Sequence, residues 1–203
     1  MPATRTYAIA ASAIVVAGLG VGTWFAFSGG DGTDCGGGLT TGNASIGGPF
    51  TLVSETGETV TDTDIIDRPT LVYFGYTFCP DVCPVDAANM AAATDILAED
   101  GKEVRTVFIT IDPARDTPEV LADFTDNLHP DMIGLSGSDE QIATAAKAYR
   151  AFYQKGPGDD PEFYLMDHSA FIYLMTPDEG FKDVFRHGIS PEEIAEKTAC
   201  YIS

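Results

Sequence analysis

The chain has 203 residues, which is enough for one soluble domain and additional segments. Its 31 acidic and 11 basic residues give a formal net charge of −20, which argues against binding to nucleic acid or to anionic lipid head groups, because both attract cations. The acidic composition indicates a well-solvated surface, and a basic docking partner is the alternative interpretation.

An uncharged stretch of 21 residues, 7–27, lies near the start of the chain. As a helix it would be roughly 30 Å long, which matches the hydrocarbon core of a bilayer. Arg5 precedes it and acidic residues follow it, so we expect residues 1–6 in the cytoplasm and the rest of the chain on the other side. A cleaved signal peptide is the alternative, since Ala26-Phe27-Ser28 resembles a cleavage site. Both interpretations export the following domain, and the length of the apolar run favours a retained transmembrane helix.

Residues 28–48 are rich in glycine and predict a flexible tether with an end-to-end distance of about 25 Å. The folded domain is then expected at residues 49–203. It opens with PFTLVSETGETVT, residues 49–61, which is typical of a β-hairpin with Gly57 in its turn.

Apolar strands and helical segments alternate along the rest of the domain. The predicted strands are residues 70–76, 103–111, 132–137, 162–166, 170–175 and 181–188. The predicted helices are residues 85–100, residues 139–153, and two that begin at Thr117-Pro118 and at Ser190-Pro191. Alternation of strands and helices predicts parallel strands, and the closely spaced strands near the end predict an antiparallel pair. We therefore expect an α/β fold with a mixed sheet flanked by helices.

The stretch YFGYTFCPDVCP, residues 73–84, places Cys79 and Cys83 directly after a predicted parallel strand. The carboxyl ends of such strands form the functional edge of an open α/β sheet. Because Pro84 disfavours helical geometry at the residue before it, we expect the helix to start at Pro84. Cys83 would then lie at a helix N-terminus, which favours a thiolate. The spacing fits a disulfide, a redox couple or a metal clamp equally well.

Two further residues can reach this edge. Asp112 ends the second parallel strand, and His168 precedes the strand 170–175, whose start lies at the same edge if that strand is antiparallel. Two thiolates and one imidazole form a soft ligand set that suits Cu(I) and is usable by Cu(II) or zinc. Asp167 is positioned to orient the imidazole ring. The other two histidines, His129 and His187, are expected to cap or decorate the ends of elements.

Three motifs together, YFGYTFCPDVCP, TIDPARDTPEVL and YLMDHSAFIYLM, resemble the Sco/SenC family of copper chaperones in order and spacing. The resemblance covers roughly residues 47–201. It implies a thioredoxin-like fold, a membrane anchor and an exported domain that faces the periplasm from the inner (cytoplasmic) membrane. It also implies one copper ion per chain, bound through Cys79, Cys83 and His168.

The family's role implies cytochrome c oxidase subunit II as the partner, with its binuclear copper site as the destination of the metal; other copper chaperones are further candidates. On this interpretation the protein is a metallochaperone and not an enzyme. The alternatives are a thiol–disulfide oxidoreductase that uses Cys79 and Cys83, and a peroxide-reducing thiol enzyme. His168 has no necessary part in disulfide exchange, which favours metal binding.

The remaining motif residues and cysteines have structural interpretations. Asp112 is expected to support the site loop, while Arg115 and Asp116 hold the turn after the second parallel strand. Cys35 and Cys200 lie outside the family's copper motif. In an oxidising compartment an even number of cysteines favours pairing, so a Cys35–Cys200 disulfide is expected, with two free thiols as the alternative.

Overall fold

The computed structural model describes residue 35, residues 46–157, residue 160 and residues 163–202. The predicted transmembrane helix, residues 7–27, lies outside these ranges, as does most of the predicted tether. Among the helices that the structure describes, none combines the length and the apolar character needed to cross a membrane.

Seven strands of the described residues form the central sheet, in the order β2-β1-β5-β4-β3-β8-β9. Their bounds are β1 Thr51–Ser54, β2 Thr59–Thr61, β3 Thr70–Gly75, β4 Arg105–Thr110, β5 Met132–Ser136, β8 Phe171–Thr176 and β9 Gly180–Arg186. The three middle strands β3, β4 and β5 are parallel, and the other pairs are antiparallel. The expected mixed sheet and N-terminal hairpin are thus confirmed, with Gly57 at a φ of 83° in the turn.

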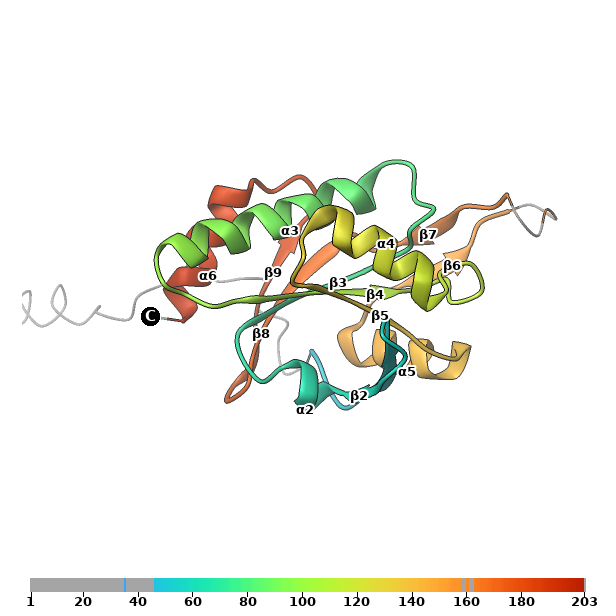
Figure 1. Ribbon diagram of the computed structural model, residues 1–203, viewed down its shortest axis with the longest axis horizontal. Helices are drawn as coiled ribbons and strands as arrows, with labels where there is room; N and C mark the ends of the chain where they lie inside the picture. Colours follow the sequence, from blue (N-terminus) through green and yellow to red (C-terminus); the bar gives the residue numbers. More distant parts are fainter. Residues whose placement is uncertain (1–34, 36–45, 158–159, 161–162, 203) are drawn as a thin grey trace, which may run out of the picture. The chain divides into compact units, whose positions relative to one another are not determined.

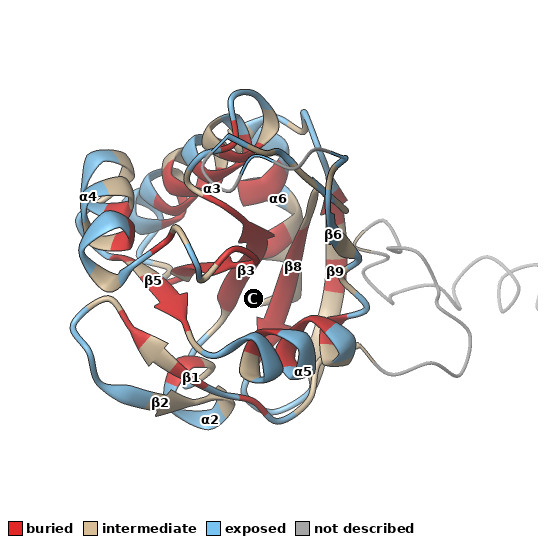
Figure 2. Cartoon of the chain, turned by 90° about the vertical axis from the view of Figure 1, so that its right-hand side faces the viewer, coloured by how far each residue is buried: buried red, intermediate tan, exposed pale blue. Residues whose placement is uncertain are grey.

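Helices cover both faces of this sheet, as Figures 1 and 2 show. Helices α3, α4 and α6 lie on one face, and α5 lies on the other. The bounds are α2 Asp62–Ile65, α3 Val82–Glu99, α4 Pro118–Leu128, α5 Asp139–Tyr149 and α6 Pro191–Tyr201. Every residue of β3 is buried, which explains why its sequence is continuously apolar rather than alternating.

Two helix boundaries differ from the prediction. Helix α3 begins at Val82, two residues before the expected start at Pro84. Proline is tolerated there because backbone N–H groups in the first helical turn have no intrahelical acceptor to lose. Helix α5 ends at Tyr149 rather than continuing to Tyr153, because Arg150 adopts a left-handed conformation with a φ of 56°.

The residues after α5 form a small separate sheet. Strand β6, Tyr153–Lys155, pairs in antiparallel fashion with β7, Met166–His168. Strand β7 therefore lies closer to His168 than the predicted strand 162–166, and only Met166 belongs to both the predicted and the observed strand. This hairpin lies outside the central sheet (Figure 1). His168 is the last residue of its second strand, β7.

A disulfide joins Cys35 to Cys200 near the end of α6, as expected. The other two cysteines, Cys79 and Cys83, are free thiols. The four cysteines are therefore divided into one structural bridge and one reduced pair.

Candidate metal centre

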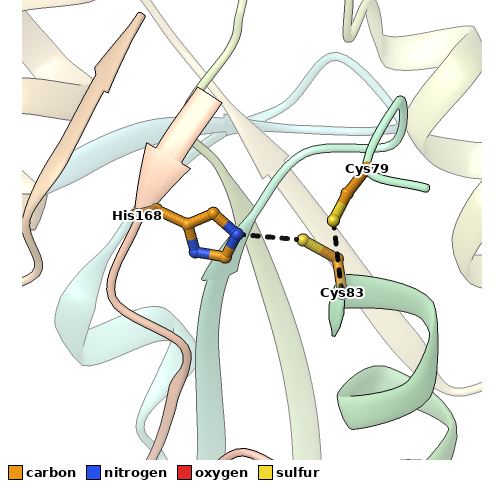
Figure 3. A group of neighbouring side chains, drawn as sticks. All are labelled: Cys79, Cys83 and His168. Atoms are coloured by element: carbon orange, nitrogen blue, oxygen red, sulfur yellow. Dashed lines mark hydrogen bonds between the residues drawn. The ribbon is translucent and has the colours of Figure 1, made fainter. Parts of the chain in front are cut away.

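Cys79, Cys83 and His168 meet at the carboxyl end of β3 (Figure 3). Within the part of the chain that the structure describes, one ligand atom from each residue lies within 4.8 Å of the other two. The loop after β3 supplies Cys79, and the first turn of α3 supplies Cys83. Strand β8 is antiparallel to β3, so the end of β7, just before β8, reaches the same edge.

The two sulfur atoms occupy different environments. The backbone N–H of Cys83 donates a hydrogen bond of 3.4 Å to Cys79 Sγ, so this sulfur lies at the N-terminus of α3. A further hydrogen bond, from the Cys83 thiol, lowers the pKa of Cys79 well below its ordinary value. The same hydrogen bond, together with burial, raises the pKa of Cys83. Cys83 lies in the first turn of α3, as expected, but the lowered pKa belongs to Cys79, chiefly because the Cys83 side chain donates a hydrogen bond to it.

The His168 ring is oriented by the backbone. Its Nδ1 lies 3.2 Å from the Ser169 carbonyl oxygen, and its Nε2 lies 3.3 Å from Cys83 Sγ. A hydrogen on Nδ1, donated to that carbonyl, leaves the Nε2 lone pair directed at the sulfurs. Tyr73 and Tyr76 contact the ring with their own rings nearly perpendicular to it. The imidazole is thus held ready to act as a ligand through Nε2.

Asp167 does not orient this ring, contrary to the expectation from sequence. It is exposed, and its carboxylate accepts a hydrogen bond of 3.5 Å from the Gln154 side chain. Asp167 and His168 are consecutive in β7, and successive side chains of a strand point to opposite faces. The Ser169 carbonyl, and not the Asp167 carboxylate, contacts Nδ1 of the His168 ring.

Asp112 and Arg115 tie the site loop to the hairpin that carries His168. Asp112 is buried, pairs with the guanidinium of Arg115 and accepts a hydrogen bond of 2.7 Å from the Tyr164 hydroxyl. Arg115 also donates to the Tyr164 carbonyl at 2.9 Å, and its guanidinium lies over the rings of Tyr164 and Phe78. We refer to Asp112, Arg115, Tyr164 and Phe78 as the Arg115 cluster. Asp112 therefore supports the site through Arg115 and Tyr164, without contact to His168 in the hydrogen bonds described.

Asp116 anchors the loop before Cys79. It is fully buried and accepts hydrogen bonds from the Thr77 backbone and hydroxyl, at 3.0 and 2.6 Å, and from the Thr110 hydroxyl at 2.5 Å. Burial raises the pKa of this carboxyl, while the three donors act in the opposite direction. The motif at residues 112–117 thus holds the turn, as the sequence suggested, and also fixes the cysteine loop.

One feature of the site was missed in the sequence. The buried carboxylate of Asp86 connects Tyr73, whose hydroxyl donates to it at 3.1 Å, with His187, whose Nδ1 lies 2.9 Å away. His187 was expected only to cap or decorate the end of an element. Sequence separations of 13 and 101 residues give no local signal for this contact.

Fold and site together define a thioredoxin-like α/β protein with two cysteines and one histidine arranged as a soft metal centre. The family model described as SCO1/SenC matches residues 39–203, and the chain belongs to this family.

Among its relatives is Protein SenC of Rhodobacter capsulatus, which is 50% identical over 204 residues that cover 98% of this chain and 91% of that protein. The human mitochondrial SCO1 homologue is 39% identical over 79% of this chain, but this match spans only 54% of the human protein's length. The crystal structure of Arabidopsis thaliana ScoI with copper bound superposes with a TM-score of 0.73 at 37% identity, over 78% of this chain and 99% of that one.

Proposed function

We propose that this protein binds one copper ion through Cys79, Cys83 and His168 and delivers it for assembly of the binuclear copper site of cytochrome c oxidase. The observation that carries the proposal is the convergence of the three ligand atoms within 4.8 Å. Two thiolates and an imidazole form a soft set that suits copper. The copper-bound structure of a relative in the same family supports the choice of metal. The family resemblance supports subunit II of the oxidase as the partner.

Metal analysis of the reduced protein tests copper binding. The wild type should retain one copper per chain, and the Cys79→Ser, Cys83→Ser double variant should retain none, because only thiolates give the site its high affinity for copper. His168→Ala should lose tight binding. His129→Ala is the matched control, since His129 pairs with Asp95 away from the site and should leave binding unchanged. Full copper loading of the double variant would contradict the assignment.

A thiol–disulfide oxidoreductase is the second candidate, and the two free thiols with unequal pKa values favour it. Exchange requires only the cysteines, whereas copper delivery also requires the imidazole. In a deletion strain, His168→Ala should therefore retain thiol exchange but fail to restore oxidase assembly. If His168→Ala assembled the oxidase normally while either cysteine variant did not, the reductase function would replace copper delivery.

We further propose that the protein is a single-pass protein of the inner membrane. Residues 1–6 would lie in the cytoplasm, residues 7–27 would form the anchor, residues 28–48 the tether, and residues 49–203 a periplasmic domain. The apolar run after Arg5 supports this arrangement.

Protease added to intact spheroplasts should digest the domain, because the arrangement exposes it on the outer side of the membrane. A cytoplasmic protein followed on the same blot is the control. Protection of the domain would reverse the orientation, and a soluble product that starts near Gly29 would show that the segment is cleaved.

A further inference from the structure

Tyr76 contacts both segments that carry the metal ligands. It directly follows β3 and is 2% exposed. Its carbonyl oxygen accepts a hydrogen bond of 3.2 Å from the Cys79 backbone N–H, which closes the turn that carries the first cysteine. Its side chain contacts β7, the strand that ends at His168. One residue thus connects the cysteine loop with the histidine strand.

The Tyr76 hydroxyl takes the place of a neighbouring strand for β7. The Gly156 N–H donates to the Leu165 carbonyl in the β6–β7 ladder, so the N–H of the next residue, Met166, points away from β6. That N–H donates to the Tyr76 hydroxyl at 3.2 Å. Met166 lies two residues before His168, and residues two apart in a strand share a face. The hydroxyl therefore fixes the backbone of β7 next to the ligand.

The ring of Tyr76 contacts the imidazole itself. The two ring centroids are 5.9 Å apart, and the ring planes lie at 87°. Tyr73 makes a similar contact with His168 at 6.3 Å and 88°, but its hydroxyl donates to Asp86 of α3. Of the two tyrosines beside the imidazole, Tyr76 is therefore the one whose hydroxyl bonds to β7.

We propose that Tyr76 is a positioning residue whose hydroxyl sets the approach of His168 to the two cysteines. His168 Nε2 lies 3.3 Å from Cys83 Sγ. Without the hydroxyl, the partly buried Met166 N–H has no acceptor, which is unfavourable. Strand β7 then shifts toward water and carries the imidazole away from the sulfurs. The inference rests on the proposed function for its copper measurement, but its metal-free measurement does not.

Tyr76→Phe tests the proposal because it keeps the ring and removes only the hydroxyl. Competition with a Cu(I) chelator should give a copper affinity about two- to tenfold below that of the wild type, the contribution of one hydrogen bond. In a His168→Ala background, the same substitution should change the weaker remaining affinity less than about twofold, because no imidazole remains to be positioned. Equal losses in both backgrounds would overturn the proposal, since a general structural role does not require His168.

Proton NMR of the reduced, metal-free protein gives the second measurement. Neighbouring aromatic rings shift the resonances of the His168 ring hydrogens away from those of a solvent-exposed histidine. Because Tyr76→Phe retains the ring, a return toward those positions reports a displaced imidazole. The Met166 amide should also exchange with solvent about two- to tenfold faster. Tyr201→Phe is the matched control, since its hydroxyl bonds Asp183 at the end of α6, far from β7 in Figure 1, and the His168 resonances should not move.

The two measurements separate this inference from the proposed function. If the wild type binds no copper while the His168 resonances respond to Tyr76→Phe and not to Tyr201→Phe, copper binding fails and the positioning role stands. If copper binds but Tyr76→Phe changes neither the affinity nor the resonances, the positioning role is overturned and the proposed function stands.

Discussion

At the scale of single residues, the two cysteines of the site are chemically different. Cys79 is 9% exposed and caps α3 with its sulfur, whereas Cys83 is fully buried and donates its hydrogen to Cys79. The asymmetry gives a reduced protein one thiolate that solvent can reach and one protected thiol. An incoming copper ion would therefore meet Cys79 first.

The pH dependence of alkylation tests this difference. Iodoacetamide attacks the thiolate, and a cysteine with an ordinary pKa of about 8.5 loses reactivity roughly tenfold per pH unit below that value. Because the pKa of Cys79 is lowered, its thiolate persists as the pH falls. Its alkylation rate in the reduced wild-type protein, followed at Cys79 by tandem mass spectrometry, should be nearly constant from pH 8 to pH 6, because the Cys83 thiol that lowers this pKa is present. Cys83 in the Cys79→Ser variant is the control, and a tenfold decrease per unit at Cys79 would contradict the assignment of the thiolate.

At the scale of elements, the third ligand depends on a hairpin outside the central sheet. Strands β6 and β7 pair only over three residues each. The Arg115 cluster and the hydrogen bond from the Met166 N–H to the Tyr76 hydroxyl, 3.2 Å long, connect this hairpin to the cysteine loop. The distance between His168 and the cysteines therefore depends on these contacts as well as on the pairing of β8 with β3.

Arg115→Gln should loosen this connection. We expect faster hydrogen exchange in peptides that cover β6 and β7, and copper affinity about tenfold lower, the usual effect of removing a group that supports a metal ligand. Exchange mass spectrometry and competition with a copper chelator measure the two effects. Arg68→Gln makes the same change of charge at an exposed ion pair with Asp67 and Glu103. Equal losses of affinity in both variants would show an effect of net charge instead.

The sequence predicts some of these elements well and others poorly, for physical reasons. Buried strands such as β3 and β4 and the capped start of α4 carry strong local patterns, and the structure confirms them. Strand β6 was not predicted, because its first residue continues the helical pattern of α5. The helix ends at the left-handed Arg150, where no glycine or proline marks the break.

The candidate site shows the same limit. The spacing of Cys79 and Cys83 and the edge rule for parallel strands brought the cysteines and His168 together correctly. Hydrogen-bond partners could not be predicted, since Asp86 reaches His187 across the fold and Asp167 turns away with the alternation of β7. Such contacts depend on the orientation of side chains after folding.

At the scale of the whole molecule, the Cys35–Cys200 disulfide connects positions 165 residues apart. A crosslink over so long a loop restricts the unfolded chain strongly, and a typical contribution is about 2–4 kcal/mol. The Cys35→Ser, Cys200→Ser variant should lose about this much free energy of unfolding in urea, with copper binding retained. The reduced wild type is the control and should match it. A variant as stable as the oxidised wild type would show that the bridge adds no stability.

The same bridge closes residues 35–200 into a ring of polypeptide. A single proteolytic cut at any point between residues 35 and 200 opens the ring but leaves one covalent molecule. Nicked protein would therefore stay attached to whatever holds its N-terminus and would migrate as one species until a reductant separates the fragments. In an oxidising compartment, a damaged copy would remain one molecule rather than being released in pieces.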